Sequence, residues 1–296
     1  MDKNEIVQTV NGFTENARIK FYLGHKNSNN EYSFLQCNIK DEIQSKIFDF
    51  LKEEIVAIID KTELKDYDPV GKEDGTIEYM DAVNVEGYQK IKQNLDDLNN
   101  MCNTLQDLGT INFYILEIEE QNRNVKIFRR YSKNKTLKKG FLMRITNDIF
   151  DKINDEVFQI DNLIDFILIG DVNFVIMNRY SFEIITNYKD NYTKNLDNAL
   201  KDIEQSQIID NIEQFKEDCR ESIKIAKQFT KAMQENSINF VLNHKEKFSA
   251  AIKEAQLPIN FQNDKFIYDN KEQLSILVAL LSDKYAKTLI GERITD

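Results

Sequence analysis

One stretch of this chain, between residues 122 and 144, carries many positive charges and no negative ones. Its nine basic residues are Arg123, Lys126, Arg129, Arg130, Lys133, Lys135, Lys138, Lys139 and Arg144. The other 30 basic residues stand against all 50 acidic residues, so the remainder of the chain has a formal charge of −20. Charge segregated in this way suits a protein that meets a polyanion with one face only.

Ammonium and guanidinium groups bind nucleic-acid phosphates by displacing counterions, and mobile lysines suit this contact better than they suit base recognition. Strand alternation would place Lys126, Phe128 and Arg130 on one face, so that two cations flank an aromatic ring. We therefore expect sequence-tolerant, salt-sensitive binding of double-stranded DNA. The candidate DNA-binding residues are Lys126, Arg129, Arg130, Lys133, Lys135, Lys138, Lys139 and Arg144. The alternative is a solvated hairpin whose charges keep a sheet edge soluble.

Residues for catalysis or metal binding are scarce in this sequence. His25 and His244 are the only histidines, and neither has a Cys, an Asp or a second His at ligand spacing. No glycine-rich phosphate loop is present. Glu63-Leu64-Lys65 matches the Glu-x-Lys part of a restriction-type nuclease motif, but it follows a helix and lies in a turn-rich connector. We expect no enzyme activity, metal or cofactor; a nuclease whose acids gather only in space remains an alternative.

The composition predicts a globular protein with a substantial core. Of 296 residues 41% are hydrophobic, and only nine Gly and two Pro are present, which disfavours long flexible linkers. Cys37, Cys102 and Cys219 are odd in number and far apart, as expected in a reducing compartment. Since no apolar run approaches the length of a membrane span, we expect a soluble, cytoplasmic protein.

The first third of the chain predicts two short strands, at 18–24 and 33–39, and two helices. The first helix is marked by apolar residues at three- and four-residue steps: Ile43, Ile47, Phe48, Leu51, Ile55 and Ile58. A turn-rich, acidic connector is expected over 61–87. The second helix is marked by Ile91, Leu95, Leu98, Cys102 and Leu105.

The middle third predicts an antiparallel β-meander. Strands are expected at 111–117 and around Val125 and Ile127, and then near 141–145, 157–160, 163–168, 172–177 and 181–186. Gly170-Asp171 and Asn178-Arg179 fall where tight turns would join strands. Phe166, Phe174 and Phe182 are expected in the core. Asp165 and Glu183 are set among apolar residues, so we expect partly buried acids that pair with Arg129, Arg144 or Arg179.

The last third returns to helical spacing. A long apolar stripe, which could also supply an oligomer interface, is formed by Ile212, Phe215, Cys219, Ile223, Ala226, Phe229 and Met233. After a break at Asn236–Ser237, a helix is expected to run to Leu257, where Pro258 ends it. A strand pair at 259–261 and 265–268 and a helix at 272–281 complete the pattern.

These patterns predict an α+β fold, with an antiparallel β-meander core flanked by amphipathic helices and a helical C-terminal region. We expect an N-terminal α/β region at 1–108 and a second domain at 109–296, divided into the meander at 109–188 and a helical part at 189–296.

A family resemblance is carried by the stretch Asp165-Phe166-Ile167, Gly170-Asp171, Phe174-Val175-Ile176-Met177-Asn178, Phe182-Glu183-Ile184-Ile185 and Tyr188. In order and spacing it resembles the string "iDfi…gd.ifI.n…FE.if.y" of the KwaB-like family of bacterial anti-phage proteins. The segments Leu280-Leu281-Ser282-Asp283-Lys284-Tyr285 and Leu289-Ile290-Gly291-Glu292 resemble the closing segment of that family. The resemblance spans about 111–296, whereas the first hundred residues agree in general character only.

The resemblance implies the soluble component of the Kiwa defence system, which works with a small multi-pass membrane protein and binds DNA without sequence preference. Such a protein would be cytoplasmic, recruited to the inner face of the membrane by its partner, and homo-oligomeric. The resemblance brings no catalytic residues, and its DNA contacts are not a motif that transfers by position. The eight candidate residues therefore rest on charge segregation. A protein-only adaptor that docks through its acidic N-terminal half remains a further alternative.

Overall fold

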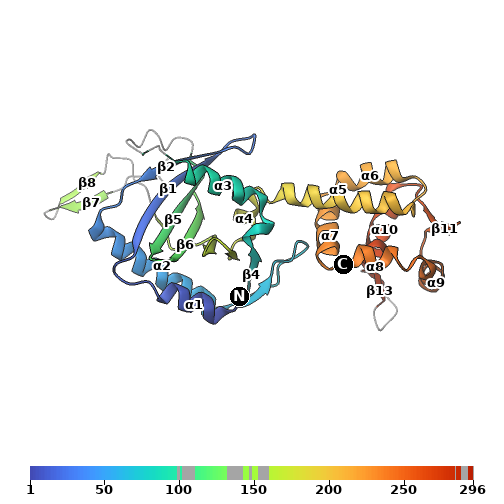
Figure 1. Cartoon of the computed structure of the whole chain (residues 1–296), viewed down its shortest axis with the longest axis horizontal. Coiled ribbons are helices and arrows are strands. Elements are labelled where there is room, and N and C mark those ends of the chain that lie inside the picture. Colours follow the sequence, from blue (N-terminus) through green and yellow to red (C-terminus); the bar gives the residue numbers. More distant parts are fainter. Residues whose placement is uncertain are drawn as a thin grey trace. The chain divides into compact units, whose positions relative to one another are not determined.

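The computed structural model describes residues 1–98, 101, 111–131, 143–146, 149–152, 160–283, 285–287 and 293–295. The chain forms two compact units (Figure 1). Unit 1 comprises Met1–Tyr67 and Glu73–Tyr188, and unit 2 comprises Asp68–Lys72 and Lys189–Asp296. Along the chain, unit 1 ends at Tyr188 and unit 2 continues from Lys189. The domain boundary expected at residue 108 stays a prediction, since this residue lies outside the described residues.

Unit 1 is built on a sheet that has eight strands in the described part of the chain, in the order β2-β1-β5-β6-β9-β10-β4-β3. The strands are β1 (Arg18–Lys26), β2 (Tyr32–Cys37), β3 (Glu63–Asp66), β4 (Thr76–Asp81), β5 (Phe113–Glu120), β6 (Arg123–Arg130), β9 (Phe166–Ile169) and β10 (Asn173–Ile176). All neighbours are antiparallel except β3 and β4, which are parallel. The mixed α+β class with a largely antiparallel sheet is therefore confirmed.

Helices cover both faces of this sheet (Figure 1). They are α1 (Lys3–Asn11), α2 (Asp41–Lys61), the short 3-10 helix η1 (Ala82–Asn84), α3 (Glu86–Asp96) and α4 (Arg179–Ile185). A separate antiparallel ribbon joins β7 (Met143–Thr146) to β8 (Ile149–Lys152).

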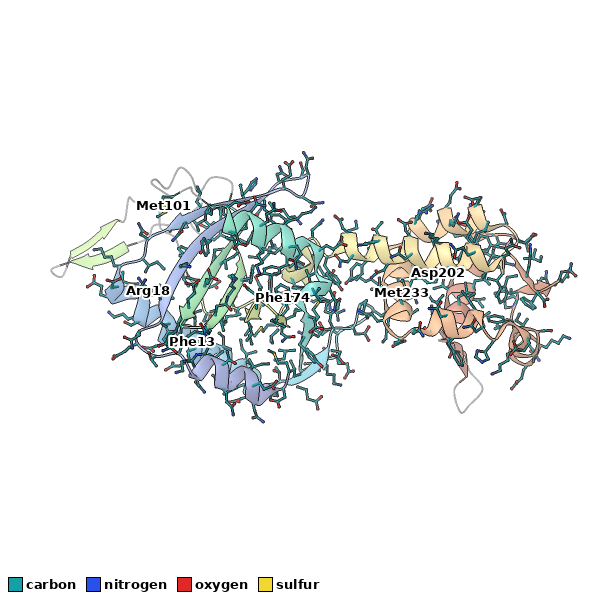
Figure 2. All side chains as sticks on the ribbon, viewed as in Figure 1. Phe13, Arg18, Met101, Phe174, Asp202 and Met233 are labelled. Atoms are coloured by element: carbon teal, nitrogen blue, oxygen red, sulfur yellow. The ribbon has the colours of Figure 1, made fainter. Side chains whose placement is uncertain are left out.

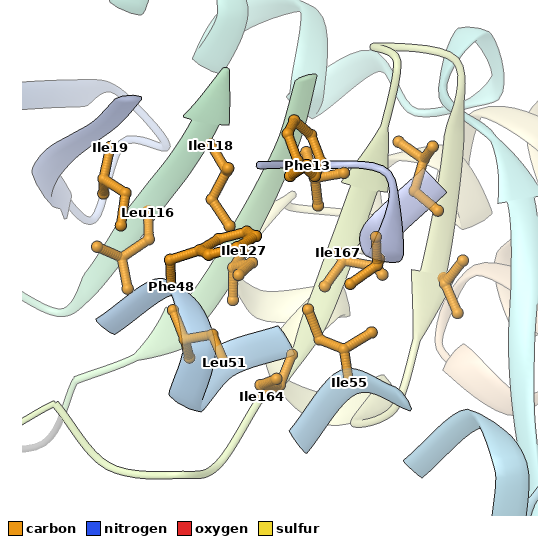
Figure 3. Close-up of a cluster of buried hydrophobic side chains, with 14 of the residues drawn as sticks. Phe13, Ile19, Phe48, Leu51, Ile55, Leu116, Ile118, Ile127, Ile164 and Ile167 are labelled. Carbon is orange, nitrogen blue, oxygen red and sulfur yellow. The ribbon is translucent and has the colours of Figure 1, made fainter. Parts of the chain in front are cut away.

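One face of the sheet packs against α1 and α2 in an apolar layer (Figure 3). Alternate residues of neighbouring strands, such as Leu116 and Ile127, meet Phe48, Leu51 and Ile55 of α2 in this layer. Because successive strand residues point to opposite faces, this layer uses every second position of each strand. Of the residues expected to mark this helix, Phe48, Leu51 and Ile55 are buried, whereas Ile43 is 43% exposed and the last buried position is Ile59 instead of Ile58.

The opposite face is filled by aromatic rings from the strands, α3 and α4. Phe166, Phe174 and Phe182 are fully buried, as expected, and each ring centroid lies 5.2–5.7 Å from the other two. Phe174, labelled in Figure 2, also contacts Tyr88 of α3 edge-on at 5.2 Å. Glycine at position 87 allows this packing, since a Cβ there would lie 1.6 Å from the carbonyl oxygen of Thr186.

The structure corrects two predictions in unit 1. The expected connector 61–87 contains the strands β3 and β4, because β4 pairs with β10 and β3 forms the sheet edge beside β4, which local sequence does not reveal. The expected strand 181–186 is the helix α4, and the expected turn at Asn178 is its N-cap, whose side chain accepts from Ser181 N. Phe182 and Ile185 then face the core at helical rather than strand spacing.

Other predicted elements are matched in part. Gly170 and Asp171 both have positive φ and form the tight turn between β9 and β10. Residues 157–159 of the expected strand 157–160 and the second half of the expected helix, including Cys102 and Leu105, fall outside the described residues. The helix α3 itself ends at Asp96.

Unit 2 is helical. Its elements are α5 (Lys189–Ser206), α6 (Ile212–Arg220), α7 (Ile223–Gln234), α8 (Ser237–Leu242), η4 (Lys245–Lys247), α9 (Phe248–Ala255), β11 (Asn260–Gln262), β12 (Lys265–Ile267), η5 (Lys271–Gln273), α10 (Leu274–Leu281), β13 (Tyr285–Lys287) and β14 (Arg293–Thr295). The apolar stripe expected from Ile212 to Met233 is divided between two helices at Ser222, which is the N-cap of α7. Ile223, a member of that stripe, is 45% exposed. Within the described residues, no helix is long and apolar enough to cross a membrane.

Candidate nucleic-acid interface

Lys126, in the middle of β6, lies buried between two carboxylates. Its Nζ is 2.8 Å from Glu117 Oε1 and 2.5 Å from Asp171 Oδ1. Only 8% of its side chain is exposed. Tyr22 donates a hydrogen bond to Glu117 at 3.1 Å, and Tyr88 donates one to Asp171 at 2.9 Å. The charge of Lys126 is therefore neutralised within unit 1.

The titration of this cluster follows from burial and pairing. Burial by itself raises the pKa of the Asp171 carboxyl. The hydrogen bond and the charge of Lys126, with smaller contributions from Tyr88 and Lys92, outweigh burial, so this pKa lies below its usual range. Burial lowers the pKa of Lys126, but Glu117 and Asp171 raise it above the usual value. Burial, and then Asp171, raise the pKa of Tyr88. All three groups therefore keep the protonation states that the pairing requires.

Arg129 is also neutralised, on the other face of β6. Its guanidinium forms two bonds to Asp161, at 3.0 and 2.8 Å, and reaches Asp165 at 3.2 and 3.3 Å. Hydrogen bonding to Asp161 raises the pKa of Arg129, against burial, and Asp165 adds to the increase. The sequence-based pairing of Asp165 with Arg129 is thus confirmed. Asp165 is 1% exposed, so the pair neutralises a buried carboxylate.

Asp165 connects β6 to the start of α4. Its carboxylate accepts from the backbone N–H of Arg130 at 2.6 Å. Its own carbonyl accepts from the N–H groups of Met177 and Asn178, at 3.0 and 2.7 Å. Since Asn178 caps α4, one residue positions both the end of β6 and the beginning of this helix.

Arg130, the last residue of β6, is half-buried. Its guanidinium carbon is 5.1 Å from the ring centroid of Tyr180, which is the second residue of α4 and 65% exposed. Among the residues that the structure describes, no carboxylate forms an ion pair with this guanidinium. Arg130 is therefore a half-buried candidate that contacts an aromatic ring and has no acidic partner among the described residues.

The remaining candidates are placed only in part. Arg144 lies in β7, where its backbone pairs with Asp151 of β8. Lys133, Lys135, Lys138 and Lys139 lie outside the described residues. The structure therefore brings together Lys126, Arg129 and Arg130 along one strand, and of these it leaves Arg130 without an acidic partner among the described residues.

Three other charged residues that the sequence singled out have partners in the structure. Arg179 forms an ion pair with buried Glu78, with Nε 3.1 Å from Oε2, and its guanidinium lies 4.9 Å from the ring of Tyr67. The hydroxyl of Tyr67 donates to Glu183 at 2.9 Å. In β3, Lys65 contacts Glu63 and Glu73 at the surface. Within the described residues, no three His, Cys, Asp or Glu side chains gather as a metal site.

Tyr180 was not among the sequence-based candidates. The sequence predicts that Tyr180 lies at a turn between two strands, and an aromatic residue at a turn does not by itself indicate a binding site. The buried residues Ser181, Phe182 and Ile185 follow helical spacing. This spacing indicates a helix whose outer face includes Tyr180 and Ile184.

Comparisons with known proteins agree with the motif that runs through β9, β10 and α4. The family model described as "Kiwa protein KwaB-like" matches residues 108–291, which is more than half of the chain. An uncharacterized protein of Ureaplasma parvum serovar 3 is 42% identical over 62 residues, covering 21% of this chain and 77% of that protein. No solved structure matches the chain. The chain therefore belongs to the KwaB-like family of Kiwa proteins and is a component of an anti-phage defence system.

Proposed function

We propose that this protein is a non-enzymatic, sequence-tolerant DNA-binding effector of the defence system. The observation that carries the proposal is the absence of acids from residues 122–144 in a chain whose net charge is −11. Lysine and arginine side chains on such a segment release counterions when they contact phosphates, and this supplies affinity without reading bases. The large negative charge elsewhere restricts DNA to this part of the surface.

We restrict the proposed contact set to cations without a buried acidic partner. Lys126 and Arg129 are neutralised by carboxylates inside unit 1, so we assign them to the stability of the sheet. Arg130, the four lysines of 132–142 and Arg144 remain as proposed phosphate contacts. In this proposal the buried ion pairs hold β6 in position, and they therefore also position Arg130 at the end of β6.

The proposed mechanism is occupancy of an invading genome. Several protomers that bind one DNA molecule add avidity, so that moderate affinity for each site suffices. A homo-oligomer recruited to the inner face of the membrane by a multi-pass partner of the same system would place these sites where DNA enters the cell. The acidic remainder of the surface is available for protein contacts.

A charge-reversal variant tests the DNA site. Replacing Lys133, Lys135, Lys138 and Lys139 by Glu is expected to weaken binding of a 30-base-pair duplex roughly 100-fold or more at low salt and to flatten the salt dependence, because about four phosphate contacts are lost. The measurement is a titration by fluorescence anisotropy at several salt concentrations.

The matched control reverses Lys46, Lys90, Lys201 and Lys253, which are exposed and lie on helices. It has the same net charge as the test variant, so a loss due only to overall repulsion would affect both proteins equally. Equal affinities of the two variants would remove the segment from the proposed interface.

Incubation with linear and circular DNA plus Mg²⁺ or Mn²⁺ tests the absence of catalysis. Intact DNA is expected. Cleavage that one Asp or Glu substitution abolishes would replace occupancy by a metal-dependent nuclease mechanism. Capture of a membrane protein without any DNA shift at low salt would instead identify a protein-only adaptor.

A further inference from the structure

The outer face of α4 combines exposed apolar surface with two cations from β1 and β6, the strands on either side of β5. Tyr180 is 65% exposed, and Ile184, one turn later, is 37% exposed. Arg130 of β6 lies against the Tyr180 ring, and Lys26 of β1 donates through Nζ to the carbonyl of Ile184. We call Tyr180, Ile184, Arg130 and Lys26 the α4 ridge.

The α4 ridge is held in place by buried groups. Ser181, Phe182 and Ile185 of the same helix are buried. The backbone of Arg130 is bonded to the carboxylate of Asp165. A ring fixed on a packed helix loses little conformational entropy when it contacts a ligand, which favours affinity.

The chemistry of the α4 ridge suits an unpaired nucleobase. An aromatic ring stacks on the flat face of any base, but in a continuous duplex those faces are covered by neighbouring base pairs. The guanidinium leaves most of the Tyr180 side chain open to solvent. Arg130 contacts the Tyr180 ring and Lys26 contacts the carbonyl of Ile184, so both cations lie beside α4, where they can contact the phosphates that flank a stacked base.

We infer that the α4 ridge binds an unpaired base of DNA, with Tyr180 stacking on the base and Arg130 and Lys26 contacting the adjacent phosphates. This inference rests on the proposed DNA binding and specifies the form of DNA that the protein prefers. DNA with a single-stranded segment or a frayed end binds more tightly than a closed duplex of the same charge.

The test compares three probes of equal nucleotide number: a single strand, a duplex with a single-stranded gap, and a duplex closed by hairpins at both ends. Tyr180→Ala is expected to weaken binding of the first two roughly 5- to 150-fold, the range measured for loss of one stacked base, and to leave the closed duplex unchanged. Tyr180→Phe is expected to retain the preference, because the ring is kept.

A fluorescent base, 2-aminopurine, placed in the gap gives a second measurement. Its emission should fall when wild-type protein or Tyr180→Phe binds, and should not fall with Tyr180→Ala, since stacking quenches it. The matched control is Phe240→Ala, which removes an exposed aromatic ring, 52% accessible, from α8 of unit 2. Thermal unfolding monitors the fold of each variant.

The outcomes separate this inference from the proposed function. Equal losses on all three probes, or no loss with Tyr180→Ala, would overturn base stacking while leaving DNA binding intact. Failure of the wild-type protein to bind any probe at low salt would overturn the proposed function itself. A loss caused by Phe240→Ala as large as that of Tyr180→Ala would also contradict the inference.

Discussion

Two parts of the strand β6 use positive charge in opposite ways. In its middle, Lys126 is 8% exposed and bridges Glu117 and Asp171. At its end, half-buried Arg130 lies against the exposed ring of Tyr180. The two residues are four positions apart and share one face of the strand. Cations that look equivalent in the sequence therefore stabilise the interior in one case and are available to a ligand in the other.

The difference arises from what the topology places beside each cation. β5 runs along β6 and brings Glu117 opposite Lys126, and the β9–β10 turn brings Asp171 to the same point. At Arg130 the neighbouring carboxylate, Asp165, accepts from the backbone N–H instead of the guanidinium. Burying a charge is costly unless it is paired, so the sheet can hold Lys126 only because both acids are present.

The largest expected effect is on the buried cation. Lys126→Met keeps the aliphatic stem but leaves Glu117 and Asp171 without their shared partner, and we expect a loss of about 3 kcal/mol in the free energy of unfolding, near the lower limit for broken buried pairs because Asp171 is partly exposed. Denaturant unfolding measures this change. DNA affinity of the folded variant should be unchanged.

Lys92→Met is the matched control, because Lys92 contacts the same Asp171 at 3.6 Å with 43% of its side chain exposed. Its loss should be below about 1 kcal/mol. Adding Glu117→Gln and Asp171→Asn to Lys126→Met should restore much of the stability. An additive further loss would contradict the assignment of a buried ion-pair cluster.

An intermediate effect is expected in the acid range. The pKa of Asp171 is lowered in the folded protein, so its ionised form contributes stability above the unfolded value of about 4, and this contribution is lost as the pH falls through the folded pKa. Unfolding free energies of the wild type and Asp171→Asn, measured from pH 7 to pH 2, should converge on acidification. Parallel curves would show that Asp171 gains nothing from Lys126.

The smallest expected effect is on the surface cation. Arg130→Ala should change stability by no more than about 1 kcal/mol, the value of an exposed cation–π contact. It should weaken DNA binding a few-fold and reduce the slope of log K against log salt by about one, as for loss of a single phosphate contact. A large loss of stability without change in the salt slope would place Arg130 with the buried cations.

The same contrast shows how far sequence patterns reach. A short apolar run with residues on both faces predicted β5, which is buried at six consecutive positions, and the alternation of Val125 and Ile127 predicted β6. The pairing of Asp165 with Arg129 was expected because an acid among apolar neighbours needs a cation. The region 181–186 was misassigned, since Phe182-Glu183-Ile184-Ile185 is compatible with either period over so short a run. Its helical state depends on the cap at Asn178 and on packing of Phe182 against Phe166 and Phe174.

By itself the sequence determined the α+β class, the aromatic core, the segregation of positive charge and the motif of the family. These depend on composition and on spacing over a few residues. Only the tertiary structure decided which cations are neutralised, because the acids that pair with Lys126 and Arg129 include Asp171 and Asp165, 45 and 36 residues away in the chain. Electrostatic energy depends on distance in space and on burial, and neither is written in the local order of residues.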